Sequence, residues 1–171
     1  NYPHILGANN TRIEFGLSRP SNVLNLLEFS TNVSRRIYGP ASLVLYLPNL
    51  DHAYGGYYEI EGPYVGSDGS GASTQIWREY DKTLTIFRED GFLDANGSIN
   101  FRVVNPELFT MNKLGVPYCD NTPCDTNMRF WIEGHESSLL SRRVIEDVTY
   151  VPMIQSSSLR FNPSIFESNA T

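Results

Sequence analysis

Apolar and polar residues alternate one by one along most of the chain, which is typical of β-strands with one buried face. The clearest runs place apolar side chains at positions 13, 15 and 17, at 84 and 86, at 99, 101 and 103, and at 128, 130 and 132. A less regular run extends from 144 to 150. Residues 43–47 are apolar on both faces, which predicts a central strand that is covered twice.

Turn-forming pairs such as Gly39-Pro40, Asp90-Gly91 and Asn96-Gly97 separate these runs. Many short strands with frequent turns predict a mainly β fold, a two-sheet antiparallel β-sandwich that is jelly-roll-like or Ig-like. We expect about eight to ten strands of ordinary length and at most one or two short helices. Residues 21–36 and 137–147 also have apolar side chains at helical spacing, so the pattern alone leaves strand and helix open there.

The length of 171 residues fits one domain, 1–171, in which a segment from residue 156 onward is expected to dock at a sheet edge. The net charge of −6 and the scarcity of Lys argue against a protein that binds nucleic acid through its phosphates. No apolar run reaches the length of a membrane span, so we expect no membrane insertion. The first residue, Asn1, is what a processed product or an excised domain would show.

The two cysteines, Cys119 and Cys124, enclose a short stretch with the turn chemistry of Asn, Thr and Pro. This spacing predicts a disulfide that staples a loop, and a disulfide indicates an oxidising compartment. A zinc site lacks its other ligands nearby. Four sequons predict glycosylation of a secreted or cell-surface protein, at Asn9, Asn32, Asn96 and Asn169.

A tyrosine-rich segment is the best candidate for a binding surface, with side chains Tyr54, Tyr57, Tyr58 and Tyr64 among several glycines. Tyrosine presents a flat apolar ring with a polar rim at low entropic cost, which suits sugar rings or a protein partner. The alternative is a β-hairpin whose aromatic side chains pair across the strands.

Residues 90–97 gather oxygen ligands around two glycines, with Asp90, Asp94 and Asn96 as weak candidates for calcium. The closing glutamate of a helix-loop-helix site is missing. Asn96-Gly97 is also the favoured sequence of a two-residue hairpin turn, and we favour the turn. We therefore expect neither a metal nor a cofactor.

Motifs for catalysis are missing: the chain has no nucleophile elbow, zinc-protease helix or phosphate loop. We interpret the protein as a non-catalytic extracellular recognition or adhesion module that binds glycan or protein. One alternative is a structural subunit of a surface layer, filament or capsid that self-assembles through its C-terminal segment. Another is a secreted glycoside hydrolase whose carboxylates come from Glu59, Glu61 and Glu79.

Overall fold

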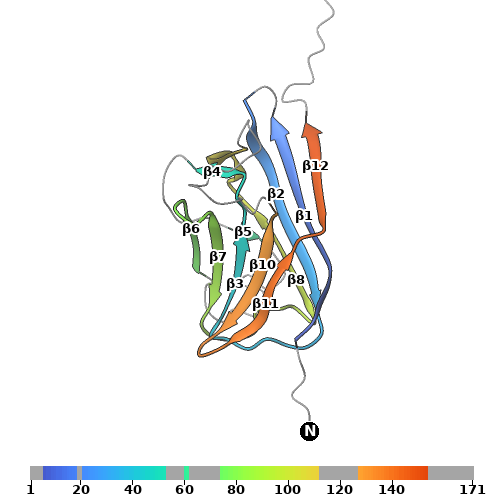
Figure 1. The fold of residues 1–171 in the computed structure, drawn as a ribbon, viewed down its shortest axis with the longest axis vertical. Coiled ribbons are helices and arrows are strands. Elements are labelled where there is room, and N and C mark those ends of the chain that lie inside the picture. The colour runs from blue at the N-terminus through green and yellow to red at the C-terminus, as the bar shows by residue number, and fades with distance from the viewer. Residues whose placement is uncertain (1–5, 19–20, 53–59, 62–73, 112–126, 154–171) are drawn as a thin grey trace, which may run out of the picture.

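Two β-sheets pack face to face in the computed structural model, which describes residues 6–18, 21–52, 60–61, 74–111 and 127–153 (Figure 1). This is the predicted mainly β, sandwich-like architecture. Within the described residues the only helical element is a single 3-10 turn, η1 (Pro106–Leu108). The part of the chain that the structure describes contains no helix that is long and apolar enough to cross a membrane.

The larger sheet has seven strands, five of which lie side by side. Their order is β12 (Asp147–Met153), β1 (Ala8–Ser18), β2 (Val23–Val33), β8 (Ser98–Val103) and β5 (Ile60–Glu61). The short strand β9 (Phe109–Met111) also pairs with β2, and β4 (Leu50–His52) pairs with β9. This sheet therefore carries both the first and the last strand of the described residues.

The smaller sheet has five antiparallel strands. Their order is β11 (Ser138–Val144), β10 (Arg129–Gly134), β3 (Ala41–Tyr46), β7 (Thr83–Arg88) and β6 (Thr74–Arg78). Strand β3 is central, as its apolar run predicted. Leu43 and Leu45 are fully buried on its inner side, whereas Val44 on its outer side is covered by neighbouring side chains and not by a further layer.

The core is built from the alternating positions that the sequence pattern identified. Phe29 joins the two sheets, because its ring centroid lies 5.7 Å from that of Phe130 and 5.6 Å from that of Phe101. Burial of such side chains stabilises a fold by roughly 1.5–3 kcal/mol each. The other fully buried core side chains include Ile13, Phe15, Leu27, Leu43, Leu45, Leu84, Ile86, Ile99 and Ile132.

Four features differ from the sequence prediction or resolve it. The two segments with helical spacing are the strands β2 and β11. The irregular run from 144 to 150 is two strands, because the chain leaves the smaller sheet after Val144 and enters the larger one at Asp147. Strand β12 runs parallel to β1, so the larger sheet is mixed and not purely antiparallel. The described residues form twelve strands, and β4, β5 and β9 are too short for a pattern to reveal.

Candidate functional site

The predicted tyrosine surface and the predicted disulfide lie outside the described residues, which exclude Tyr54, Tyr57, Tyr58, Tyr64, Cys119 and Cys124. The same holds for Asn169, for the C-terminal segment from residue 156 and for Glu59. These assignments remain predictions. The structure does describe strand β4, which ends at His52 directly before the tyrosine-rich segment, and the elements packed against it.

A network of charged side chains ties β4 to the turn between β6 and β7. The Glu79 carboxylate accepts hydrogen bonds from the His52 backbone N–H at 3.1 Å and from Trp77 Nε1 at 2.8 Å. Lys82 Nζ forms ion pairs with Glu79 and, at 2.7 Å, with Asp51 Oδ1. Strand β4 is therefore anchored to the β6–β7 turn.

The pKa values of this network follow from its contacts. Partial burial alone would raise the pKa of Glu79, but the bonds from Lys82 and Trp77 outweigh burial and lower it. Burial would lower the pKa of Lys82, but Asp51 and Glu79 raise it. Burial lowers the pKa of His52, against the opposing charge of Glu79. Glu79 is thus an ionised, hydrogen-bonded structural carboxylate, whereas a glycosidase general acid requires a raised pKa.

Tyr80 lies at the tip of the hairpin that this network holds. Its side chain is fully exposed, with a relative accessibility of 101%. Lys82, two residues later, has a left-handed backbone with φ of 55°, which closes the turn. A large aromatic ring that contacts little of its own domain is available for a partner. The sequence analysis did not single out Tyr80, because nothing in its neighbourhood distinguishes it from a core tyrosine.

The calcium candidates are arranged around a hairpin turn. Asp94 is buried, and its carboxylate accepts hydrogen bonds from the backbone N–H groups of Ile37 at 2.7 Å and Gly97 at 2.8 Å. Arg36 Nε lies 3.0 Å from the second oxygen. Asn96 and Gly97 have positive φ angles of 53° and 85°, as a two-residue turn requires. The oxygens of Asp94 are therefore engaged in holding the turn that leads into β8.

Three of the four predicted glycosylation sites lie at one end of the larger sheet, where β1 begins, β2 ends and β8 begins (Figure 1). Asn9 and Asn32 are cross-strand partners on β1 and β2, and Asn32 is also the partner of Ser98. Asn96 lies in the turn that precedes Ser98. All three asparagine side chains are exposed. The β6–β7 turn with Tyr80 lies at the other end of β7, which begins at Thr83 and ends at Arg88, from where the chain leads to the turn with Asn96.

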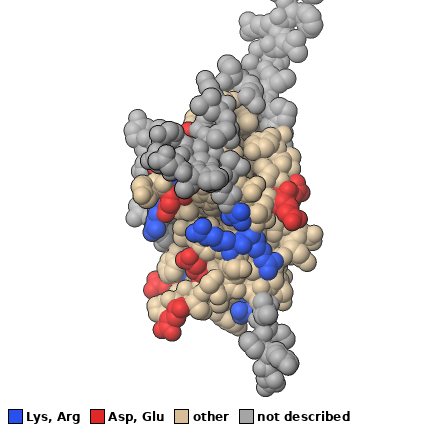
Figure 2. Space-filling view, in the orientation of Figure 1, with Lys and Arg blue, Asp and Glu red and all other residues tan. Residues whose placement is uncertain are grey.

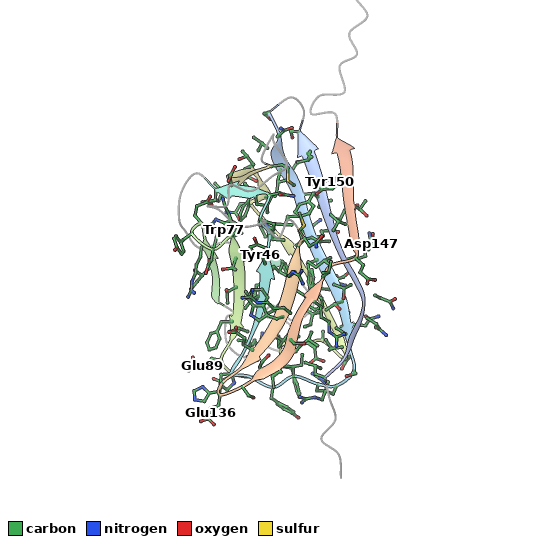
Figure 3. All side chains as sticks on the ribbon, viewed as in Figure 1. Tyr46, Trp77, Glu89, Glu136, Asp147 and Tyr150 are labelled. Atoms are coloured by element: carbon green, nitrogen blue, oxygen red, sulfur yellow. The ribbon has the colours of Figure 1, made fainter. Side chains whose placement is uncertain are left out.

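The outer face of the smaller sheet carries a groove of about 550 Å³. Three cross-strand neighbours form the base of the groove: Trp131 on β10 is paired with Val44 on β3, and Val44 is paired with Thr85 on β7. Tyr46 on β3 lies on the same sheet in Figure 3. The remaining lining residues are mostly polar and include Ser42, Arg78, Asp81, Thr83, Glu133 and Arg142. No sequence signal marked this groove, because its lining residues come from all five strands of the smaller sheet and from the β6–β7 turn.

The outer face of the larger sheet is different in character. A smaller hollow of about 230 Å³ there is lined mainly by polar and charged side chains, Arg12, Glu14, Glu28, Ser30 and Asn100. Arg12 and Glu14 form an ion pair at 3.2 Å, and Arg102 pairs with Glu28 at 3.8 Å. Such neighbouring charges are typical of a solvated surface. Among the described residues, no group of three or more His, Cys, Asp and Glu side chains could hold a metal ion.

Comparisons with known proteins leave the chain without an assigned family. No protein-family model matches it, and no curated protein matches it. Among solved structures, it is similar to the sixth cohesin of scaffoldin B from Acetivibrio cellulolyticus, solved in complex with a mutant Cel5 dockerin. That likeness covers 86% of this chain and 100% of the other, with 13% identity and a TM-score of 0.26. A similarity this low transfers no property to this chain.

Proposed function

We propose that this protein is a non-catalytic extracellular recognition module that binds glycan or protein through aromatic side chains at one end of the sandwich. The observation that carries the proposal is Tyr80, an exposed ring on a turn that the Glu79–Lys82–Asp51 network holds in place. A rigid aromatic side chain loses little entropy when it binds. The tyrosines of the adjoining segment, Tyr54, Tyr57, Tyr58 and Tyr64, complete the proposed surface.

The position of the predicted glycans supports this choice of surface. Asn9, Asn32 and Asn96 are grouped at the end remote from Tyr80, so bulky glycans there leave the aromatic end accessible. The predicted Cys119–Cys124 disulfide belongs to the same extracellular assignment. Thiol labelling of the native, unreduced protein is expected to modify neither cysteine, and labelling of both would contradict that assignment.

Single alanine substitutions test the aromatic surface. Tyr80→Ala, Tyr57→Ala and Tyr58→Ala are expected to weaken binding on a glycan array or to an immobilised protein ligand. Tyr38→Ala is the matched control, because Tyr38 is 69% exposed but precedes β3 at the opposite end of the smaller sheet. Binding that survives all three substitutions, or that falls equally in the control, refutes the proposed surface.

A further inference from the structure

Trp131 contacts two charged side chains, Glu133 and Arg142, on the outer face of the smaller sheet. Trp131 Nε1 donates a hydrogen bond to Glu133 Oε1 at 2.8 Å, which fixes the orientation of the indole ring. The guanidinium of Arg142 lies over that ring, with Cζ 4.3 Å from the ring centroid. Trp131 is only 8% exposed, so it serves as a support for Arg142 more than as a surface of its own.

A β-bulge directs Arg142 to this position. Phe130 pairs with Arg143 and Ile132 pairs with Leu140, so Ser141 and Arg142 together lie opposite Trp131 alone. Bulges commonly redirect a side chain at a binding site, and they disrupt regular pairing where they occur. Here the bulge brings the guanidinium of an edge strand over a ring of the neighbouring strand.

The stacked guanidinium retains its capacity to donate hydrogen bonds. Arg142 makes no hydrogen bond and no ion pair with another described residue, and the same holds for Arg78. The guanidinium that lies over the Trp131 ring offers a planar fork of N–H donors, which matches the oxygens of a carboxylate or a sulfate. The contact with the ring restricts the Arg142 side chain before binding, so less entropy is lost when the anion binds.

Arg142 lines two grooves that meet at its side chain. The first is the groove above β3 and β10, and the second, of about 590 Å³, lies between β11 and the start of β1. Because the two grooves share Arg142 as a lining residue, we consider them together as the double groove. Side-chain hydroxyl and amide groups in the two grooves can bond sugar hydroxyls: Ser42, Thr83 and Thr85 in the first, and Asn10 and Thr11 in the second.

The charges of this double groove favour an anionic ligand although the chain as a whole has a net charge of −6. Four arginines line it, Arg78, Arg129, Arg142 and Arg143, and Figure 2 shows basic side chains gathered across the middle of this face with acidic ones around them. Its carboxylates are Asp81, Glu133 and Glu146. Two of these are engaged, because Thr83 donates to Asp81 at 2.9 Å and Trp131 donates to Glu133.

We infer that the double groove binds a chain of an acidic polysaccharide, with a carboxylate or sulfate group on Arg142 and neutral hydroxyls along the polar lining. Two grooves that share Arg142 can hold successive units of a linear chain, and the mixture of arginines with hydroxyl and amide groups fits a ligand that carries both charges and hydroxyls. This site does not depend on the tyrosines of the proposed recognition surface, so the two proposals can fail separately.

Affinity electrophoresis and calorimetry with defined polysaccharides test the inference. The probes are polygalacturonate as a carboxylated chain, dextran sulfate as a sulfated chain, neutral dextran, and polyglutamate as an acidic peptide. The parent protein is expected to bind at least one acidic polysaccharide, more weakly at high ionic strength, and not to bind neutral dextran. Arg142→Gln is expected to weaken binding by about tenfold or more, as for a central arginine of a binding site. Arg142→Lys retains the charge but not the planar fork, so its affinity is expected to lie between those of the parent and Arg142→Gln.

Arg12→Gln is the matched control, because it removes the same charge from the outer face of the larger sheet. It is expected to bind like the parent, and an unchanged urea midpoint for Arg142→Gln shows that the fold is intact. Enzymatic removal of any glycan at Asn9, which lines the second groove, is expected to leave binding unchanged or to strengthen it. No binding of either acidic polysaccharide, equal losses in Arg12→Gln and Arg142→Gln, or equally tight binding of polyglutamate would overturn the assignment. Tyr80→Ala, Tyr57→Ala and Tyr58→Ala are expected to bind the acidic polysaccharide like the parent, because the double groove, as its described lining residues define it, does not include these tyrosines.

Discussion

Replacement of Asp94 by alanine is expected to destabilise the protein strongly, because this carboxylate satisfies three donors in a buried position. Its side chain has 0% exposure, and it bonds the N–H groups of Ile37 and Gly97 and the guanidinium of Arg36. Each buried donor that loses its acceptor costs about 1–3 kcal/mol. Arg36 retains its position over the Phe92 ring, at 3.5 Å from the centroid, and can regain water. The free energy of unfolding should therefore fall by about 3–5 kcal/mol.

Urea denaturation followed by tryptophan fluorescence measures this loss. With an m-value of about 2 kcal/mol/M, the midpoint should fall by about 2 M at constant m. Asp90→Ala is the control, because Asp90 is exposed and bonds Arg88 Nε through its backbone carbonyl, which alanine retains. The control should stay within about 0.5 kcal/mol of the parent. A loss below about 1 kcal/mol for Asp94→Ala would refute the argument from unsatisfied donors.

Three further predictions concern other parts of the fold. Contacts lower the pKa of Glu79, so its ionised form should stabilise the fold fully above the unfolded pKa near 4.5, and this stabilisation should disappear as the pH falls through the folded pKa. Thermal unfolding measured as a function of pH should therefore show a smaller loss of stability at acid pH for Glu79→Gln than for the parent. Gly97→Ala should cost about 1 kcal/mol in urea denaturation, since alanine is strained at a φ of 85°, and an unchanged midpoint would contradict the turn geometry. If the protein is made in a glycosylating host, peptide-N-glycosidase should lower its mass, and Asn9→Gln, Asn32→Gln and Asn96→Gln should each remove one step of that change.

The alternating patterns predicted the core well because a half-buried strand imposes the same constraint on every second residue. Phe101, for example, is buried between exposed Asn100 and Arg102, and each of these positions can be read without knowledge of its neighbours in space. The run from 144 to 150 failed for a physical reason. Ile145 is buried where the chain passes from one sheet to the other. The alternation of buried and exposed residues in β11 therefore does not continue in the same register into β12.

The candidate site was less accessible to sequence reasoning. Trp131 and Arg142 are distant from Thr85 and Arg78 along the chain, and only the strand order of the smaller sheet brings them to one face. The bulge opposite Trp131 leaves no local signature in the sequence, since neither Ser141 nor Arg142 is a typical bulge residue. Single-sequence patterns report the period of an element, whereas a groove depends on which elements become neighbours.

The parallel pairing of β12 with β1 has a consequence for how the protein folds. These two strands come from opposite ends of the described fold, so β1 keeps one unpaired edge during synthesis until the last strand emerges. An unpaired edge with alternating apolar residues is a template for association with other chains. The order of synthesis therefore makes β12 a closing strand, and a chain that ends before Asp147 would leave this edge of β1 open to association with other chains.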